Sequence, residues 1–319
     1  MENEPAFKKL LFLTDGSAPS LSAQELTIQL AKKLGAEVTV FHVVTHELMR
    51  PIVQDFLLQG RGIPESADSE PATIVRSEIS LGRQTPTAHG AHYGETTEGE
   101  ITAVYRQQGE EVVADSAQSF KEEGIHAEPK VVENKNIVEA VMEEVERENY
   151  DFMIMGRSGR KEKESRLGAI AEKMSRHSEI PVLVAGEKST LARLLVPVDG
   201  SKSSQRALAF AAALARKTGA TVTLLHVQES RLFNSHPELT ETIGNGILSD
   251  AAEKVKGITF DQKLESGDPP RKILDIAEKG GFDLIVMGSC GHNAIARFLL
   301  GSVSNHVLHY TKHAVLVVK

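Results

Sequence analysis

Short apolar runs recur along the chain and predict buried strands. They lack the polar and apolar alternation of a half-exposed strand, which is typical of parallel strands covered by helices on both faces. Between two of these runs, Ser204–Lys217 places alanine and leucine on one side and is followed by Gly219. This segment therefore predicts an amphipathic helix with a glycine stop. In the second half of the chain the runs are Leu194–Val198, Val222–Val227, Leu284–Met287 and Val315–Val318.

The second half of the chain repeats the first. Leu10–Ser17 matches Leu194–Ser201 at an offset of 184 residues, and three further pairs of segments match. These pairs are Val38–Val43 with Val222–Val227, Tyr150–Gly156 with Phe282–Gly288, and Pro181–Val184 with Ala314–Val317. The offset falls to 132 or 133 for the last two pairs, so the first copy carries an insertion of about 51 residues. Each copy alternates strands with helices, which predicts right-handed crossovers and ligands at the carboxyl ends of the strands.

These boundaries predict an α/β chain of two tandem doubly wound domains, residues 1–187 and 188–319. We expect each to be a five-stranded parallel-type sheet with helices on both faces. Residues 59–97 are rich in glycine, proline, serine and threonine and predict a loop or flexible arm, in which Ala72–Leu81 fits a short strand or a helical turn. Glu95–Gly124 predicts the second crossover helix with a solvated acidic face, and Gly186–Thr190 predicts a linker.

Composition narrows the class of protein. The 319 residues are 40% hydrophobic and 25% charged, as in ordinary globular chains. The net charge of −8 argues against a broad nucleic-acid-binding surface. A single cysteine, Cys290, excludes an internal disulfide, and the longest N-terminal apolar run, Leu10–Leu13, is too short for a signal peptide or a membrane span. We therefore expect a cytoplasmic protein with no membrane span and no nucleic-acid partner.

A glycine pattern follows the fourth strand of the second copy. It reads G-x2-G-x9-G-S, from Gly288 and Gly291 to Gly301 and Ser302, and it precedes a helix. Glycines let backbone N–H groups approach a polyphosphate, and the amino end of a helix favours negative charge. The hydroxyls of Ser302 and Ser304 are predicted donors to phosphate oxygens. The sequence thus predicts a nucleotide cleft, although it contains neither a P-loop nor a dinucleotide fingerprint.

Asp199 follows the first strand of the second copy, at the same edge of the predicted sheet. A carboxylate there is placed to accept from a ribose hydroxyl or an adenine amine, although Asp before Gly also suits a turn. We favour ligand contact for Asp199, whereas the two interpretations are evenly balanced for Asp15. His42 and His226 are predicted to be strand-end residues satisfied by backbone groups.

With these motifs, the chain resembles a tandem universal stress protein, which has two copies of the universal stress fold in one polypeptide. The resemblance covers nearly everything except the insertion, and it rests on the glycine pattern together with Val196–Ser201, Leu225–Val227 and Ser266–Pro269. It implies an adenine nucleotide alpha hydrolase-like fold, ATP as the ligand, and pairing of the last strands of the two domains. The residues it implies around ATP are Pro197, Val198, Asp199, Val227, Met287, Gly288, Gly291, His292, Gly301, Ser302, Val303 and Ser304.

The first copy departs from the pattern. Gly156 and Gly159 are present, but eight residues rather than nine lead to Gly168, and the next residue, Ala169, has no hydroxyl. We expect polyphosphate binding there to be weaker by about 1 to 3 kcal/mol because polar contacts are missing. Four basic residues crowd the same loop and fit a solvated basic surface, or else a site for another anion. They are Arg157, Arg160, Lys161 and Lys163.

Catalytic and metal-binding patterns are weaker. No nucleophile, base and orienting acid occur together, so we expect at most slow ATP hydrolysis or self-phosphorylation. His306, His309 and His313 have a metal-ligand spacing, but no thiolate or carboxylate joins them, and we expect no metal site there. Cys290 lies near a helix amino end, which can lower a thiol pKa, but redox sensing is the less favoured interpretation.

Two classes of function follow from the sequence. The first is a stress-response module that binds ATP with Mg²⁺ in the second domain and thereby changes the surface offered to a protein partner. The alternative is a nucleotide-independent scaffold that recruits a partner through the arm at residues 59–97. Deleting the arm separates the two. A homodimer is compatible with either.

Overall fold

The structure, a computed structural model, describes residues 7–45, 98–134, 136–158, 167–188, 190–229, 237–290 and 300–319. The first copy contains β1 (Lys9–Leu13), α1 (Ala18–Leu34), β2 (Glu37–Val44), α4 (Glu98–Glu122), β3 (Ala127–Glu133), α5 (Ile137–Arg147), β4 (Phe152–Met155), α6 (Ala169–His177) and β5 (Val182–Val184). The second contains β6 (Arg193–Pro197), α7 (Lys202–Thr218), β7 (Thr221–Glu229), α9 (Pro237–Lys254), β8 (Phe260–Gly267), α10 (Pro269–Gly280), β9 (Leu284–Gly288), α11 (Ser302–Tyr310) and β10 (Ala314–Val318).

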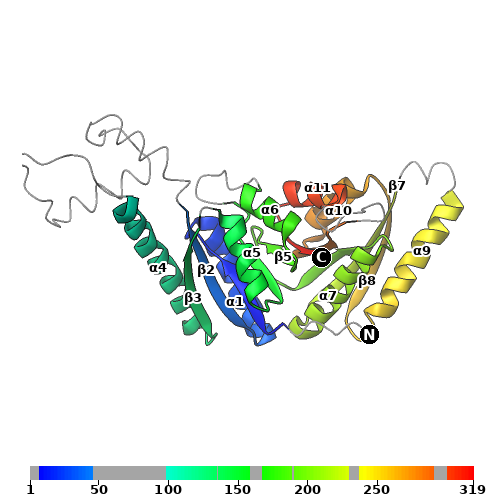
Figure 1. The fold of residues 1–319 in the computed structure, drawn as a ribbon. Coiled ribbons are helices and arrows are strands. Elements are labelled where there is room, and N and C mark those ends of the chain that lie inside the picture. The colour runs from blue at the N-terminus through cyan, green and yellow to red at the C-terminus, as the bar shows by residue number, and fades with distance from the viewer. Residues whose placement is uncertain are drawn as a thin grey trace, which may run out of the picture.

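The strands of the described residues form one ten-stranded sheet with the order β3-β2-β1-β4-β5-β10-β9-β6-β7-β8. Its two edge strands, β3 and β8, lie towards opposite sides of the view in Figure 1. Within each copy the neighbouring strands are parallel, and the order is the same in both. The chain winds outward from β1 or β6, then crosses to the other side, so each half has a switch point between its first and fourth strands. The predicted fold class of two doubly wound α/β halves is confirmed.

The last strands of the two copies pair antiparallel, as the resemblance implied. Val315, Leu316 and Val317 face Val184, Leu183 and Val182. The predicted linker begins as part of this junction. Gly186 packs so closely that an added Cβ would lie 2.3 Å from the backbone nitrogen of Ala314. Because glycine alone fits this approach, Gly186 is a packing residue and not a free spacer.

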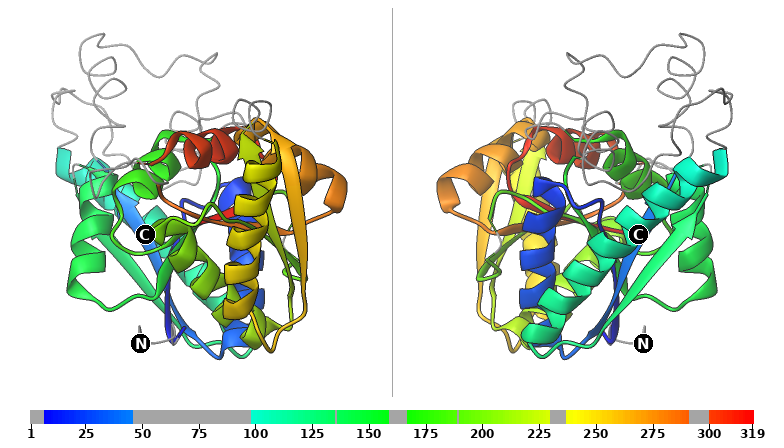
Figure 2. Two further views of the ribbon diagram at one scale, coloured as in Figure 1. Left: turned by 90° about the vertical axis from the view of Figure 1, so that its right-hand side faces the viewer. Right: turned by 90° about the vertical axis from the view of Figure 1, so that its left-hand side faces the viewer.

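Helices cover both faces of the sheet (Figure 2). One apolar cluster joins the sheet to α1, α4, α7 and α9, and the other joins it to α5, α6, α10 and α11. Along β1 the side chains alternate between them, with Phe12 in the first cluster and Leu11 in the second. The first cluster runs through both copies: Phe7 meets Phe210 of α7 at 4.9 Å between ring centroids and Phe152 of β4 at 6.0 Å. The two domains therefore share one continuous core.

The insertion enters after β2 and returns at α4, which confirms the predicted second crossover helix. Most of it, including residues 59–97 and Ala72–Leu81, lies outside the described residues. None of the helices in the described part of the chain is both long and apolar enough to cross a bilayer.

Candidate functional site

Of the predicted nucleotide residues that the structure describes, Pro197, Val198 and Asp199 lie at or just after the end of β6, and Met287 and Gly288 lie at the end of β9. The turn after β6 is tightly organised: the Val198 N–H donates to the Leu225 carbonyl at 2.8 Å, and Asp199 Oδ1 accepts from the Ser201 N–H at 2.9 Å. Ser201 caps α7 by accepting from the Ser204 N–H. Asp199 thus has the turn role weighed in the sequence analysis, at the edge where a ligand would meet it.

The histidines at the strand ends behave as predicted. His226 Nδ1 lies 2.7 Å from the Val198 carbonyl oxygen, and His42 Nδ1 lies 2.8 Å from the equivalent Thr14 oxygen. Each ring joins the end of its second strand to the turn after its first strand. The imidazoles therefore stabilise the two turns that follow β1 and β6.

Gly288 is required for a reason that the sequence did not suggest. A Cβ added there would lie 2.3 Å from Ser203 Oγ and 2.6 Å from the Ser203 backbone carbon. The end of β9 therefore presses directly against the first turn of α7. The Cys290 N–H, two residues later, donates to the same Ser203 hydroxyl at 3.3 Å. Gly288 therefore allows the end of β9 and the residues after it to approach the amino end of α7.

The amino end of α11 is the part of this site best suited to an anion. Its N-cap, Gly301, contributes no side-chain hydrogen bond, and the Asn305 N–H donates to the Gly301 carbonyl at 2.8 Å. The first N–H groups of a helix have no intrahelical acceptor, so an anion can satisfy them. Ser302 is exposed at this end. The donor set fits phosphate oxygens.

Ser304 differs from its predicted role. Its hydroxyl is buried and donates to the Gly288 carbonyl at 2.8 Å. A serine hydroxyl has one proton to donate, so it cannot also donate to a phosphate while this bond exists. Together with the bond from the Gly301 N–H to the Ser289 carbonyl at 2.7 Å, it fastens α11 to the end of β9. We assign Ser304 to positioning of the helix.

The remaining predicted residues are distributed along the same edge. Pro197 ends β6, Val227 lies on β7, and Met287 is buried within β9. Val303 packs against the apolar cluster on the α10 and α11 face, one residue into the helix from Ser302. Gly291 and His292 lie outside the described residues.

The switch point of the first copy has the same backbone contacts as that of the second, but its helix begins without a hydroxyl side chain. An added Cβ at Gly156 would meet the Pro19 backbone at 2.8 Å, and the Gly168 N–H donates to the Arg157 carbonyl at 2.7 Å, as Gly301 does to Ser289. Asp15 Oδ1 accepts from the Ser17 N–H and hydroxyl, which is a turn role. The helix then begins with Ala169, as the sequence showed.

The expectation that Arg157 lies on a solvated basic surface is wrong. Its side chain is buried, and the guanidinium donates to the carbonyl oxygens of Leu308 at 2.7 Å and His313 at 3.2 Å, both in the second copy. Burial lowers the pKa of Arg157 to about 10, partly offset by Glu187, so the guanidinium remains charged at neutral pH. The other three basic residues of that loop lie outside the described residues.

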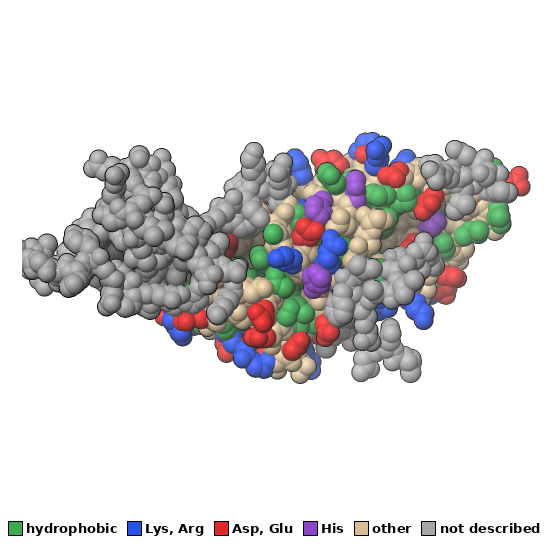
Figure 3. All heavy atoms as spheres, turned by 45° about the horizontal axis from the view of Figure 1, so that its top comes forward, with side chains coloured by type: hydrophobic (Ala, Val, Ile, Leu, Met, Phe, Trp, Pro, Cys, Tyr) green, Lys and Arg blue, Asp and Glu red, His purple; other side chains and the backbone are tan. Residues whose placement is uncertain are grey.

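The described histidines at the carboxyl end of α11 make separate contacts. His309 Nδ1 lies 2.8 Å from the Asn305 carbonyl, and His313 Nε2 lies 3.5 Å from Glu278. In the part of the chain that the structure describes, no three of His, Cys, Asp or Glu come together as ligands could. Figure 3 shows acidic, basic and histidine side chains interspersed on the face where the strands' carboxyl ends open, without a broad region of one charge.

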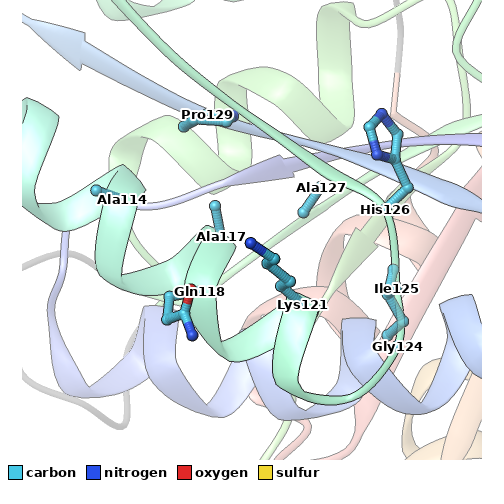
Figure 4. A pocket seen from close by; sticks show the side chains of 9 residues that line it. All are labelled: Ala114, Ala117, Gln118, Lys121, Gly124, Ile125, His126, Ala127 and Pro129. Carbon is cyan, nitrogen blue, oxygen red and sulfur yellow. The ribbon is translucent and has the colours of Figure 1, made fainter.

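A separate hollow of about 490 Å³ lies at the outer edge of the sheet, between α4 and β3 (Figure 4). Small side chains, Ala114 and Ala117 of α4 and Ala127 of β3, leave the space, and Lys121 extends along it. It is two strands away from the first copy's switch point. It therefore plays no part in the predicted cleft.

Comparison with known proteins gives a consistent family and fold. The model of the universal stress protein family matches twice, at residues 6–186 and 191–319. A universal stress protein of Synechocystis is 25% identical over 315 residues, covering 97% of this chain and 99% of that protein. The universal stress protein YxiE of Bacillus subtilis is 31% identical over 145 residues, covering 40% of this chain and 98% of that protein. A universal stress protein structure from Archaeoglobus fulgidus has a TM-score of 0.65 at 23% identity, covering 99% of each chain, which shows the shared fold.

Proposed function

We propose that this chain, which belongs to the universal stress protein family, binds ATP in its second domain and acts as a nucleotide-dependent regulatory module. One observation carries the proposal: the amino end of α11, without a side-chain cap, is fastened to the end of β9, which packs against the first turn of α7. Ligands of doubly wound sheets bind at this place, and phosphate oxygens match unpaired helix N–H groups.

We assign the phosphates and the adenosine to two different groups of residues. The N–H groups of the first turn of α11 and the Ser302 hydroxyl would donate to the phosphates. The turn at Val198 and Asp199, with Val227 on the neighbouring strand, would accommodate the adenosine. Mg²⁺ would reach the site on the triphosphate and neutralise part of its charge, since protein-bound Mg²⁺ commonly keeps substrate phosphates and water as ligands.

The difference between the copies supports a single nucleotide site. The helix of the first copy also begins at an uncapped glycine, Gly168, but its first residue is Ala169 and its loop is one residue shorter. Both helices are fastened to the residue after the fourth strand in the same way, Gly168 to Arg157 and Gly301 to Ser289, each at 2.7 Å. The difference at the helix end is therefore the missing hydroxyl, which removes a donor. We therefore propose one ATP per chain, with regulation of a protein partner as the consequence of binding.

Isothermal calorimetry with Mg-ATP tests the proposal. Ser302→Asp places a carboxylate at the amino end of α11, where it suits the helix dipole but repels phosphate. We expect wild-type protein to bind one equivalent of ATP and Ser302→Asp to bind at least 10-fold more weakly, while its thermal unfolding stays within a few degrees of wild type.

Ala169→Asp is the matched control, because it puts the same charge at the same helix position in the first copy. We expect its ATP affinity to equal that of wild type. Absence of binding by wild-type protein would contradict the proposal, and equal losses in the two variants would move the site away from α11.

A further inference from the structure

Arg157 belongs to the first domain but makes its side-chain hydrogen bonds to the second. It follows β4 in the first copy, yet its side chain crosses the junction and donates to the carbonyl oxygens of Leu308 and His313 in the second copy. Leu308 lies in the last turn of α11, where carbonyl groups have no intrahelical partner. A buried cation at this end also complements the helix dipole.

The contact of Arg157 with the opposite domain has no counterpart at the equivalent position of the second copy. Gly168 bonds to the Arg157 carbonyl as Gly301 bonds to the Ser289 carbonyl, so the second copy has a serine at the equivalent place. The carboxyl end of α6 is instead held by Lys319, whose ammonium donates to the Ser175 oxygen at 2.6 Å. Each helix thus has its carboxyl end held by a cation of the other domain, from unrelated positions in the repeat.

The helix that Arg157 holds is the one that presents its amino end to the proposed phosphate site. Figure 2 shows α6 and α11 side by side across the junction, and Arg176 of α6 also reaches Asn305 of α11 at 3.4 Å. With nine residues, α11 is only about 13 Å long, and a helix this short moves as a rigid rod. Its amino end is fastened by Ser304 to the Gly288 carbonyl, and its carboxyl end by Arg157.

We propose that Arg157 is a positioning residue for the nucleotide site of the opposite domain, setting the amino end of α11 at the distance from β9 that the phosphates require. This rests on the proposed ATP binding. The residue does not touch the nucleotide. The first domain, whose own loop is the poorer phosphate site, contributes to binding by the second through this side chain.

If Arg157 only stabilises the second domain, its substitution should affect every ligand of that domain. Comparing the affinities for adenosine and ATP distinguishes this role from positioning of α11. Adenosine lacks phosphates, so it does not need the amino end of α11. Displacing α11 lowers ATP affinity alone, whereas general loosening of the second domain lowers the affinity for both ligands.

The experiment measures binding of Mg-ATP by calorimetry and of adenosine by ligand-observed NMR, well below the melting temperature of each variant. Arg157→Met removes the donors without leaving a buried charge, and we expect ATP affinity to fall about 10-fold while adenosine affinity changes less than twofold. Arg157→Lys, which keeps the charge but loses the two-pronged geometry, gives an intermediate loss and serves as the folded alternative if the methionine variant unfolds.

Lys33→Met is the matched control. Lys33 also crosses between the domains, from α1 to the Thr218 carbonyl at the end of α7, but this contact is exposed. We expect it to leave both affinities unchanged. Wild-type ATP affinity in the folded Arg157 variants, or equal losses for adenosine and ATP, would overturn the proposal. Absence of ATP binding by the wild type would instead refute the proposed function and this inference with it.

Discussion

Leu183 and Leu316 face each other at the centre of the antiparallel pair β5 and β10, and they occupy the same position in the two repeats. Their neighbours exchange places: Val182 faces Val317, and Val184 faces Val315. The junction therefore has an approximate twofold axis through this pair. Because the sheet and the first apolar cluster continue across it, the two domains are expected to unfold together.

Substitution of Phe210 tests whether the two domains unfold together. This residue belongs to the second domain but packs against Phe7 and Phe152 of the first, with centroid distances of 4.9 and 5.7 Å. Phe210→Ala should lower the free energy of unfolding by about 3 to 5 kcal/mol through the cavity it leaves. We expect urea denaturation to remain a single transition at lower urea and amide exchange to accelerate in both β1 and β6. Phe210→Leu should cost less, and acceleration confined to the second domain would contradict a shared core.

Substitution by alanine should change the stability of the protein in opposite directions at Gly288 and Gly246. At Gly288 the new methyl would meet the Ser203 side chain and backbone, so Gly288→Ala should destabilise the protein by about 1 to 3 kcal/mol or more. At Gly246, inside α9, an added Cβ meets nothing within 4 Å, and Gly246→Ala should stabilise by about 0.5 to 1 kcal/mol. Thermal unfolding measures both. Equal shifts would show that the Ser203 contact is not tight.

Lys319 should make stability rise with pH in the alkaline range. Burial lowers the pKa of its ammonium to about 8, only partly opposed by Cys290, from the ordinary 10.5. The folded protein therefore holds fewer protons than the unfolded chain between these values, and stability increases as pH rises through the window. Measured relative to Lys319→Met, the free energy of unfolding of wild type should rise by about 2 kcal/mol between pH 7 and pH 10. A difference independent of pH would refute this.

Asp283 should contribute stability that acid removes. Burial favours its neutral form, but hydrogen bonds from the Thr190 hydroxyl and the N–H groups of Ala192 and Arg193 outweigh it, so the pKa lies below the ordinary value. The contribution is therefore present above the unfolded pKa of about 4 and is lost as pH falls below it. Chemical denaturation should show Asp283→Asn less stable than wild type at pH 7, with the gap closing towards pH 3. A gap that widens in acid would contradict the assignment.

The repeat and the apolar runs were sufficient to predict the two doubly wound halves and the sequence of strands and helices in each. The alternation of strands and helices depends on local sequence patterns. The apolar run Leu194–Val198 and the amphipathic segment after it, for example, correspond to β6 and α7. The observed boundaries differ only slightly from the predicted ones: Val198 follows β6 instead of ending it, and α7 begins at Lys202 instead of Ser204.

The roles of individual polar groups were decided by the tertiary structure. The sequence did not indicate that Gly288 packs against Ser203 or that the Ser304 hydroxyl donates to the Gly288 carbonyl. Arg157 was assigned to solvent and instead crosses to Leu308. A hydroxyl or guanidinium takes whichever acceptor folding brings near. These acceptors belong to segments distant in sequence, so no local pattern could identify them, whereas the periodicity of strands and helices is set by neighbours along the chain.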